Sequence, residues 1–322
     1  MRNGKARFVL SGVASLALAS AVAIGSAPGI AAVGSNELPA GGLSFAANAS
    51  IAIEQQDIQL SRDLITLSYT LRNDAQSPQA ILIAFSLPDL DTSALADGEV
   101  ILPSAEPANF VQFTLKVDGQ MPSYNVEQRA LALGLDVSPV LTRNRIPYFP
   151  FAAASQDKLA GLSASDRLDL IERGILKEEG PAVVAAWTLK TVAYWRQSLQ
   201  VGQKINIVIS YRPIVGVASY KTETLQSLRK RSCLSQAQEE AIAKLPAEGG
   251  IAPTFTSVGL LATNGGDQLG PAHRIRILIE TGDQSTVVAT CREGLKRTGP
   301  TQLEWTATDY LLDEDLHVLF VR

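Results

Sequence analysis

Residues 187–213 read WTLKTVAYWRQSLQVGQKINIVISYRP, and this stretch indicates the fold class. Apolar and polar side chains alternate along its two arms, Trp187–Arg196 and Lys204–Tyr211, which is the period of a strand with one buried face. Gly202 lies between the arms and can adopt a positive φ, and Pro213 ends the second arm because it has no N–H to donate. The stretch therefore predicts a β-hairpin at the centre of a β-rich protein.

The same alternation recurs on both sides of this hairpin, so we expect a mainly β fold with a few helices. The pattern predicts two β-sandwich-like lobes, an N-terminal lobe at residues 35–140 and a C-terminal β-rich lobe with one helix at residues 183–322. A Pro-rich and helical connector, residues 141–182, would join them. Within the N-terminal lobe, Asp118-Gly119 is a two-residue hairpin signal.

Two short helices are predicted from their capping residues. Ser163 is followed by Asp166 at the third helical position, and Gly174 can end that helix, which lies in the connector. Ser235 and Gln238 form a second capping box, which begins the helix of the C-terminal lobe.

The first 34 residues have the layout of a secretory signal peptide, with a short basic start and an uncharged run over residues 8–25. Small residues follow, so we expect cleavage after Ala32 or Gly34, with a retained membrane anchor as the alternative. No later segment is long and apolar enough to span a membrane. The expected location of the mature protein is therefore periplasmic or secreted.

Cleavage would remove three of the 28 basic residues and none of the 32 acidic ones, which leaves a net charge of −7. A chain of that charge is a poor partner for nucleic acid. An envelope or secreted protein, or a glycan, is the kind of partner that an exported chain would meet.

Aromatic residues are concentrated on the first arm of the predicted hairpin. Trp187 and Trp195 share one face of this arm, and Tyr194 lies on the other. Exposed aromatics often mark binding surfaces, so these three residues form a candidate ligand surface for a sugar or a peptide. The alternative, which strand periodicity favours, is that the two indoles belong to the core.

No motif in the sequence indicates catalysis, a cofactor or a metal. His273 and His317 lie in no recognisable triad or nucleophile elbow. The acidic residues between Asp89 and Glu99 lack the glycine and the bidentate glutamate of a calcium loop. The two cysteines, Cys233 and Cys291, would be free to pair in an oxidising compartment, and two separate buried thiols are the alternative.

Several short motifs match one known pattern in order and spacing, namely Gly41-Gly42-Leu43, Tyr69–Asn73 with Phe85–Asp89, Trp187 with Tyr194–Gln197, Tyr211-Arg212-Pro213 with Gly216, Cys233, and Cys291–Lys296. The mature chain resembles the exported bacterial family catalogued as domain of unknown function 4424. The resemblance implies export, a β-rich fold, a disulfide between Cys233 and Cys291, and no established activity. Residues 264–271 depart from the pattern because they contain no aromatic residue.

These observations favour a non-enzymatic binding or structural module that acts through a partner surface. The alternative is a cell-envelope hydrolase with an unrecognised active site. The two differ in what a structure should contain, because an enzyme needs titratable groups that converge in a cleft.

Overall fold

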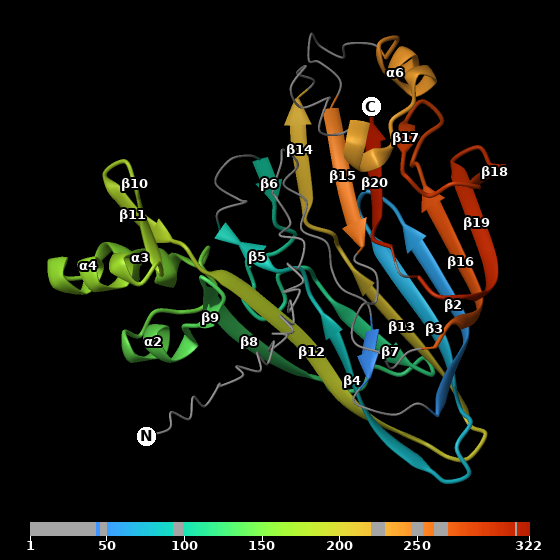
Figure 1. Ribbon diagram of the computed structural model, residues 1–322, viewed down its shortest axis with the longest axis horizontal. Coiled ribbons are helices and arrows are strands. Elements are labelled where there is room, and N and C mark those ends of the chain that lie inside the picture. Colours follow the sequence, from blue (N-terminus) through green and yellow to red (C-terminus); the bar gives the residue numbers. More distant parts are fainter. Residues whose placement is uncertain are drawn as a thin grey trace, which may run out of the picture. The chain divides into compact units, whose positions relative to one another are not determined.

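The computed structural model describes residues 43–45, 50–92, 99–219, 229–245, 254–260, 270–312 and 314–322. The fold is mainly β with a few short helices, as predicted (Figure 1). The predicted signal peptide, residues 1–34, lies outside the described residues. Among the helices described, none has the length and apolar character needed to cross a membrane.

Three sheets and a small two-stranded hairpin account for the strands of the described residues. The six-stranded sheet has the order β1-β4-β12-β8-β9, and β5 pairs with the start of β12. Its strands are β1 (Leu43–Phe45), β4 (Gln79–Ser86), β5 (Leu90–Asp91), β8 (Asn125–Ala132), β9 (Leu135–Asp136) and β12 (Thr188–Leu199).

The seven-stranded sheet has the order β18-β19-β16-β2-β3-β13-β7. Its strands are β2 (Ile51–Leu60), β3 (Ile65–Asn73), β7 (Thr114–Val117), β13 (Lys204–Tyr211), β16 (Ala272–Glu280), β18 (Lys296–Gly299) and β19 (Gln302–Tyr310). In this sheet β2 and β16 run parallel, and the other neighbours are antiparallel.

The five-stranded sheet has the order β17-β20-β15-β14-β6. Its strands are β6 (Glu99–Ile101), β14 (Val215–Ser219), β15 (Thr254–Leu260), β17 (Val287–Ala289) and β20 (Leu316–Val321). The remaining elements are α2 (Ser138–Arg143), α3 (Ala153–Ala160), α4 (Ala164–Glu172), the paired strands β10 (Leu176–Glu179) and β11 (Ala182–Ala185), and α6 (Gln236–Ile242).

The two arms of the predicted hairpin are strands, but they do not pair with each other. β12 lies between β4 and β8, whereas β13 lies between β3 and β7 in a different sheet (Figure 1). The predicted faces are correct, because Leu189 and Trp195 of β12 and Ile207 of β13 are buried in one core. The alternation is the same in both cases, because a strand buries its apolar face equally well when the other arm lies in a second sheet packed across the core.

The turn predicted at Asp118-Gly119 is also present, but it does not join two strands of one hairpin. Asp118 and Gly119 adopt positive φ angles of 49° and 78°, and Val117 and Gln120 exchange main-chain hydrogen bonds of 2.8 and 2.9 Å around them. The tight turn is therefore present. However, β7 and β8 on its two sides belong to different sheets, so the turn links sheets rather than strands of one hairpin.

The predicted division into lobes at 35–140 and 183–322 is corrected by the pairing. In the seven-stranded sheet β2 and β3, from the first range, lie between β16 and β13, from the second. In the six-stranded sheet β12 lies between β4 and β8. Alternation along one strand indicates which face is buried but not which strand lies beside it, so chain order suggested lobes that the sheets do not follow.

One large core joins the inner faces of all three sheets. It contains Phe85 and Trp195 from the six-stranded sheet, Ile207 from the seven-stranded sheet, and Val258 and Phe320 from the five-stranded sheet. The elements α2, α3, α4 and the β10–β11 hairpin form what we call the helical module (residues 138–185). A second cluster of buried residues lies among them. A third lies beneath α6.

Asn73 holds together two of the chain segments that pass from one sheet to another. Its side chain is 1% exposed, and its Nδ2 lies 3.0, 3.2 and 3.1 Å from the carbonyl oxygens of Ser77, Leu199 and Gln200. Its Oδ1 accepts from the Ala75 N–H at 2.9 Å. The β3–β4 link and the β12–β13 link are thus held side by side by one buried amide, which donates to carbonyl oxygens on both sides.

Both predicted helix caps are present. The Ser163 hydroxyl accepts from the Asp166 N–H at the start of α4, and Ser235 and Gln238 form a reciprocal capping box at the start of α6. The two leucines of α4 lie in different surroundings, because Leu168 is 58% exposed while Leu170 is buried.

Candidate functional site

The predicted ligand surface does not exist as an exposed aromatic face. Trp187 and Trp195 are 0% and 3% exposed, and they lie in different clusters, Trp187 in that of the helical module and Trp195 in the large core. Tyr194 is half-buried on the outer face of β12, where it pairs with Ala84 and Asn125. The core interpretation of the two indoles is therefore the correct one.

Trp187 nevertheless supports a surface hollow. Its Nε1 donates to the Tyr148 carbonyl oxygen at 2.8 Å, across the interior of the helical module. The Tyr148 hydroxyl contacts the Thr142 hydroxyl at 2.7 Å and donates to the Ser138 carbonyl at 3.3 Å. Tyr148 is thus held at both ends, by a buried indole behind it and by α2 beside it.

The hollow lies between β8 and α2 and has a volume of about 660 Å³. We call it the β8–α2 pocket. It is lined by Glu127, Gln128, Arg129, Asp136, Ser138, Pro139, Thr142, Arg143 and Tyr148. Two carboxylates, two guanidinium groups and several hydroxyls therefore face one open concavity beside an aromatic ring, a mixture suited to a polar ligand.

Asp136 is the last residue of β9, two residues before α2, and its surroundings favour the ionised carboxylate. Its Oδ1 accepts from the Ser138 N–H at 2.9 Å. Hydrogen bonds from the Ser138 hydroxyl and N–H hold the pKa of Asp136 below its ordinary value of 3.8, and the Arg129 cation acts in the same direction. A carboxylate of this kind is an acceptor at neutral pH and is not a general acid, which would need a raised pKa.

The β8 wall contributes a second carboxylate and a guanidinium. Arg129 donates to Glu127 at 2.6 Å, and their side chains are 63% and 51% exposed. Gln128 is half-buried, and its Nε2 donates to the Pro107 carbonyl at 2.7 Å and to the Thr191 hydroxyl at 3.2 Å. The exposed pair contributes little to stability but places charge at the pocket rim.

The α2 wall presents the helix face formed by Pro139, Thr142 and Arg143, which are three and four residues apart. The Thr142 hydroxyl donates to the Ser138 carbonyl one turn back at 2.9 Å. Arg143 is exposed in the last turn. Cationic groups are favoured there by the helix dipole.

Sequence reasoning missed this pocket, although part of its signal was present. Asp136 and Ser138-Pro139 are a helix start, with proline in the first turn, ahead of the apolar residues of α2. That signal predicts the helix but not its neighbour. The β8 wall and Tyr148 come together with α2 only through the buried contacts of the helical module.

A second hollow, of about 580 Å³, lies on the outer face of the seven-stranded sheet and is lined by Gln55, Asp57, Arg274, Arg276, Thr306, Ala307 and Thr308. Gln55 donates to Asp57 at 2.5 Å, and Arg276 donates to Glu304 at 3.0 Å. Several of its polar side chains thus already hydrogen-bond to neighbouring protein groups, and no aromatic ring lines it. The β8–α2 pocket is the better candidate.

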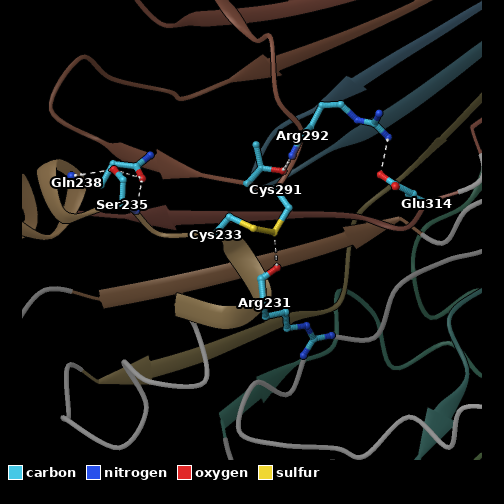
Figure 2. Close-up of a disulfide and its surroundings, with 8 residues drawn as sticks. Arg231, Cys233, Ser235, Gln238, Cys291, Arg292 and Glu314 are labelled. Atoms are coloured by element: carbon cyan, nitrogen blue, oxygen red, sulfur yellow. Dashed lines mark hydrogen bonds and ion pairs between the residues drawn. A yellow bond between two sulfur atoms is a disulfide. The ribbon is translucent and has the colours of Figure 1, made fainter.

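The structure contains the disulfide between Cys233 and Cys291, with a Cα–Cα distance of 4.9 Å and a sequence separation of 58 residues (Figure 2). Cys233 has a positive φ of 50° and lies three residues before the start of α6, and Cys291 follows β17. Gln238 of α6 also donates to the Val288 carbonyl at 2.7 Å. The bridge and this hydrogen bond fix α6 on the five-stranded sheet, and closure of such a loop constrains the unfolded chain by roughly 4 kcal/mol.

The residue after Cys291 is anchored on the other side of the bridge, away from α6 (Figure 2). The Arg292 guanidinium lies 5.0 Å from the Trp305 ring centre and donates to the Tyr310 hydroxyl at 2.8 Å. Its Nη2 is 3.8 Å from a Glu314 carboxylate oxygen. Because Arg292 already lies over both rings, and the rings also contact each other edge to face, this aromatic pair is a structural contact rather than a ligand cage.

The histidines lie away from the pocket. His273 Nδ1 is 2.9 Å from Asp309 Oδ1, and both side chains are more than 70% exposed, at 75% and 72%. His317 is half-buried within β20. Within the ranges that the structure describes, no group of three histidine, cysteine or acidic side chains is placed to hold a metal ion.

A family model described as a domain of unknown function, DUF4424, matches residues 33–319. The chain belongs to this family. The match confirms the resemblance proposed from the order of the motifs, and it spans all three sheets and the helical module. No curated protein matches the chain.

Two solved structures show what the DUF4424 chain is similar to. One, from Legionella pneumophila, is titled a "putative nutrient binding protein"; it is 11% identical, with 88% of this chain and 71% of that chain covered and a TM-score of 0.48. The other is an M1 zinc metallopeptidase from Deinococcus radiodurans, 8% identical, with 85% and 43% covered and a TM-score of 0.25. Neither similarity assigns a function to this chain.

Proposed function

We propose that this protein is a periplasmic or secreted binding module without enzymatic activity, and that its ligand binds in the β8–α2 pocket. The observation that carries the proposal is the way the lining groups are held. Asp136 is fixed by Ser138, and Tyr148 is fixed by Trp187 and α2. Groups held in this way lose little conformational freedom on binding, which favours recognition.

The electrostatics of the pocket support binding over catalysis. Catalytic acids and bases need pKa values near the working pH, which burial or like charges produce. In the pocket the pKa of Arg129 is raised and that of Asp136 is lowered, so both shifts favour the charged forms and Asp136 stays a carboxylate. This carboxylate suits a fixed contact with a cation or a hydroxyl of a ligand.

A ligand screen with a variant that fills the pocket tests the site. We expect some amino acids, short peptides or oligosaccharides to raise the melting temperature of the mature protein, and Thr142→Trp to abolish the rise by occupying the hollow. At a ligand concentration of 100 times Kd, the gain in stability is about 2.7 kcal/mol. Arg145→Gln, an exposed cation outside the pocket, is the control. Equal shifts in the parent and in Thr142→Trp would place binding elsewhere.

Export is tested separately, by the amino terminus of the mature protein. The basic start and the small-residue run predict cleavage, so N-terminal sequencing should begin between Ala31 and Leu38. An intact Met1 on membrane-bound protein would contradict cleavage and support a retained anchor.

A further inference from the structure

The charges of the β8–α2 pocket are separated along α2. Asp136 precedes the first turn, and Glu127 lies in the β8 wall. Arg143 is in the last turn of this six-residue helix. At 1.5 Å per residue the two ends of α2 are about 9 Å apart. One end of the pocket is therefore acidic and the other is basic.

The two arginines that line the pocket differ in their ion pairing. Arg129 is already paired with Glu127 at 2.6 Å and also lies near Asp136, so the two carboxylates around it exceed its single positive charge. Arg143 lines the pocket and has no ion-pair partner within the described ranges. The acidic end therefore has an acceptor to offer to a ligand cation, and the basic end has a guanidinium to offer to a ligand anion.

Uncharged polar groups also line the pocket. The hydroxyls of Thr142 and Tyr148 are 2.7 Å apart, and the Tyr148 ring lies beside them. Such groups can contact amide and carbonyl groups of a ligand, and the ring offers an apolar surface. A chain of amides with opposite charges at its ends matches this arrangement.

We propose that the β8–α2 pocket binds a short zwitterionic peptide, with its amino group at Asp136 and its terminal carboxylate at Arg143. Extended chain spans about 3.3–3.6 Å per residue, so roughly three residues bridge the two ends. This inference depends on the proposed binding function and adds the chemical class of the ligand. Its charge requirement distinguishes a peptide from a neutral sugar.

The test is calorimetric titration of the mature protein with trialanine, N-acetyl-trialanine, trialanine amide and N-acetylglucosamine. We expect trialanine to bind, and either cap to weaken binding by roughly fivefold, because each cap removes one charge-assisted contact. Arg143→Gln should become indifferent to the amide cap, and Asp136→Asn to the acetyl cap. Both substitutions keep side-chain polar atoms, and Asp136→Asn keeps the acceptor for the Ser138 N–H.

Arg145→Gln is the matched control, since Arg145 is an exposed cation just beyond α2 that does not line the pocket. It should leave all four affinities unchanged. Capped and free peptides that bind equally well, or no binding of trialanine, would overturn the zwitterion proposal. Tighter binding of N-acetylglucosamine, lost in Thr142→Trp, would also overturn it while leaving the pocket as the binding site.

Discussion

Replacing Asn73 with leucine should lower the free energy of unfolding by about 3–5 kcal/mol, although leucine has a similar size. The amide of Asn73 shares its two N–H groups among three carbonyl oxygens in a site that is 1% exposed. A buried polar group left without a partner costs about 1–3 kcal/mol, and leucine leaves several in this state. Urea denaturation, with the midpoint and slope measured separately, gives the loss.

Two further variants locate the effect in the amide donors. Asn73→Asp keeps the acceptor for the Ala75 N–H but has no N–H to donate, so it should lose at least as much stability as the leucine variant. Asn206→Leu, on the same sheet, replaces an exposed asparagine that accepts from the Thr70 hydroxyl. It should cost less than about 1 kcal/mol. Equal losses for Asn73→Leu and Asn206→Leu would show that the link contacts do not stabilise the fold.

Replacing Trp187 with alanine should cost about 3–5 kcal/mol, the usual range for a large buried aromatic. The indole is fully buried among residues of the helical module, and its Nε1 satisfies the Tyr148 carbonyl. Loss of the indole should therefore loosen the module more than the sheets. Hydrogen exchange should show reduced protection over residues 138–185, with β3 and β13 less affected.

Trp187→Phe separates volume from hydrogen bonding, because phenylalanine fills much of the site but cannot donate. It should lose less stability than the alanine variant, yet still release the carbonyl of Tyr148. Tyr194→Ala removes a half-buried aromatic from the neighbouring outer face of β12 and should cost less than Trp187→Ala. An alanine variant at position 187 that melts like the parent would contradict the assignment of Trp187 to the core.

The sequence predicts the faces of the strands better than their partners. Alternation along residues 187–213 correctly separates buried from exposed positions, because it depends on burial along one strand. The caps at Ser163 and Ser235 are likewise local and are correctly predicted. Pairing depends on contacts between distant segments, so neither the predicted hairpins nor the lobe boundaries describe the sheets.

The candidate site could not be predicted from the sequence, because it too depends on contacts between distant segments. The sequence offers Trp187 as a candidate ligand residue and favours the core as its location, and the structure places it behind the pocket rather than in it. Its position there depends on how α2 and Tyr148 pack over the end of the six-stranded sheet. Only the helix start at Asp136 to Pro139 was readable as a local pattern.

The parallel pairing of β2 with β16 affects how this chain can acquire its structure. Ile58 of β2 pairs with Ile277 of β16, so an early strand can form this pairing only with a strand from the last sixth of the chain. Non-local pairing of this kind raises the contact order, which slows folding because a long loop must close before its contacts form. During synthesis, the apolar faces of β2 and β3 have no completed sheet to join until β16 and β13 have emerged. Folding of this protein is therefore a late event that involves nearly the whole chain, rather than a succession of lobes.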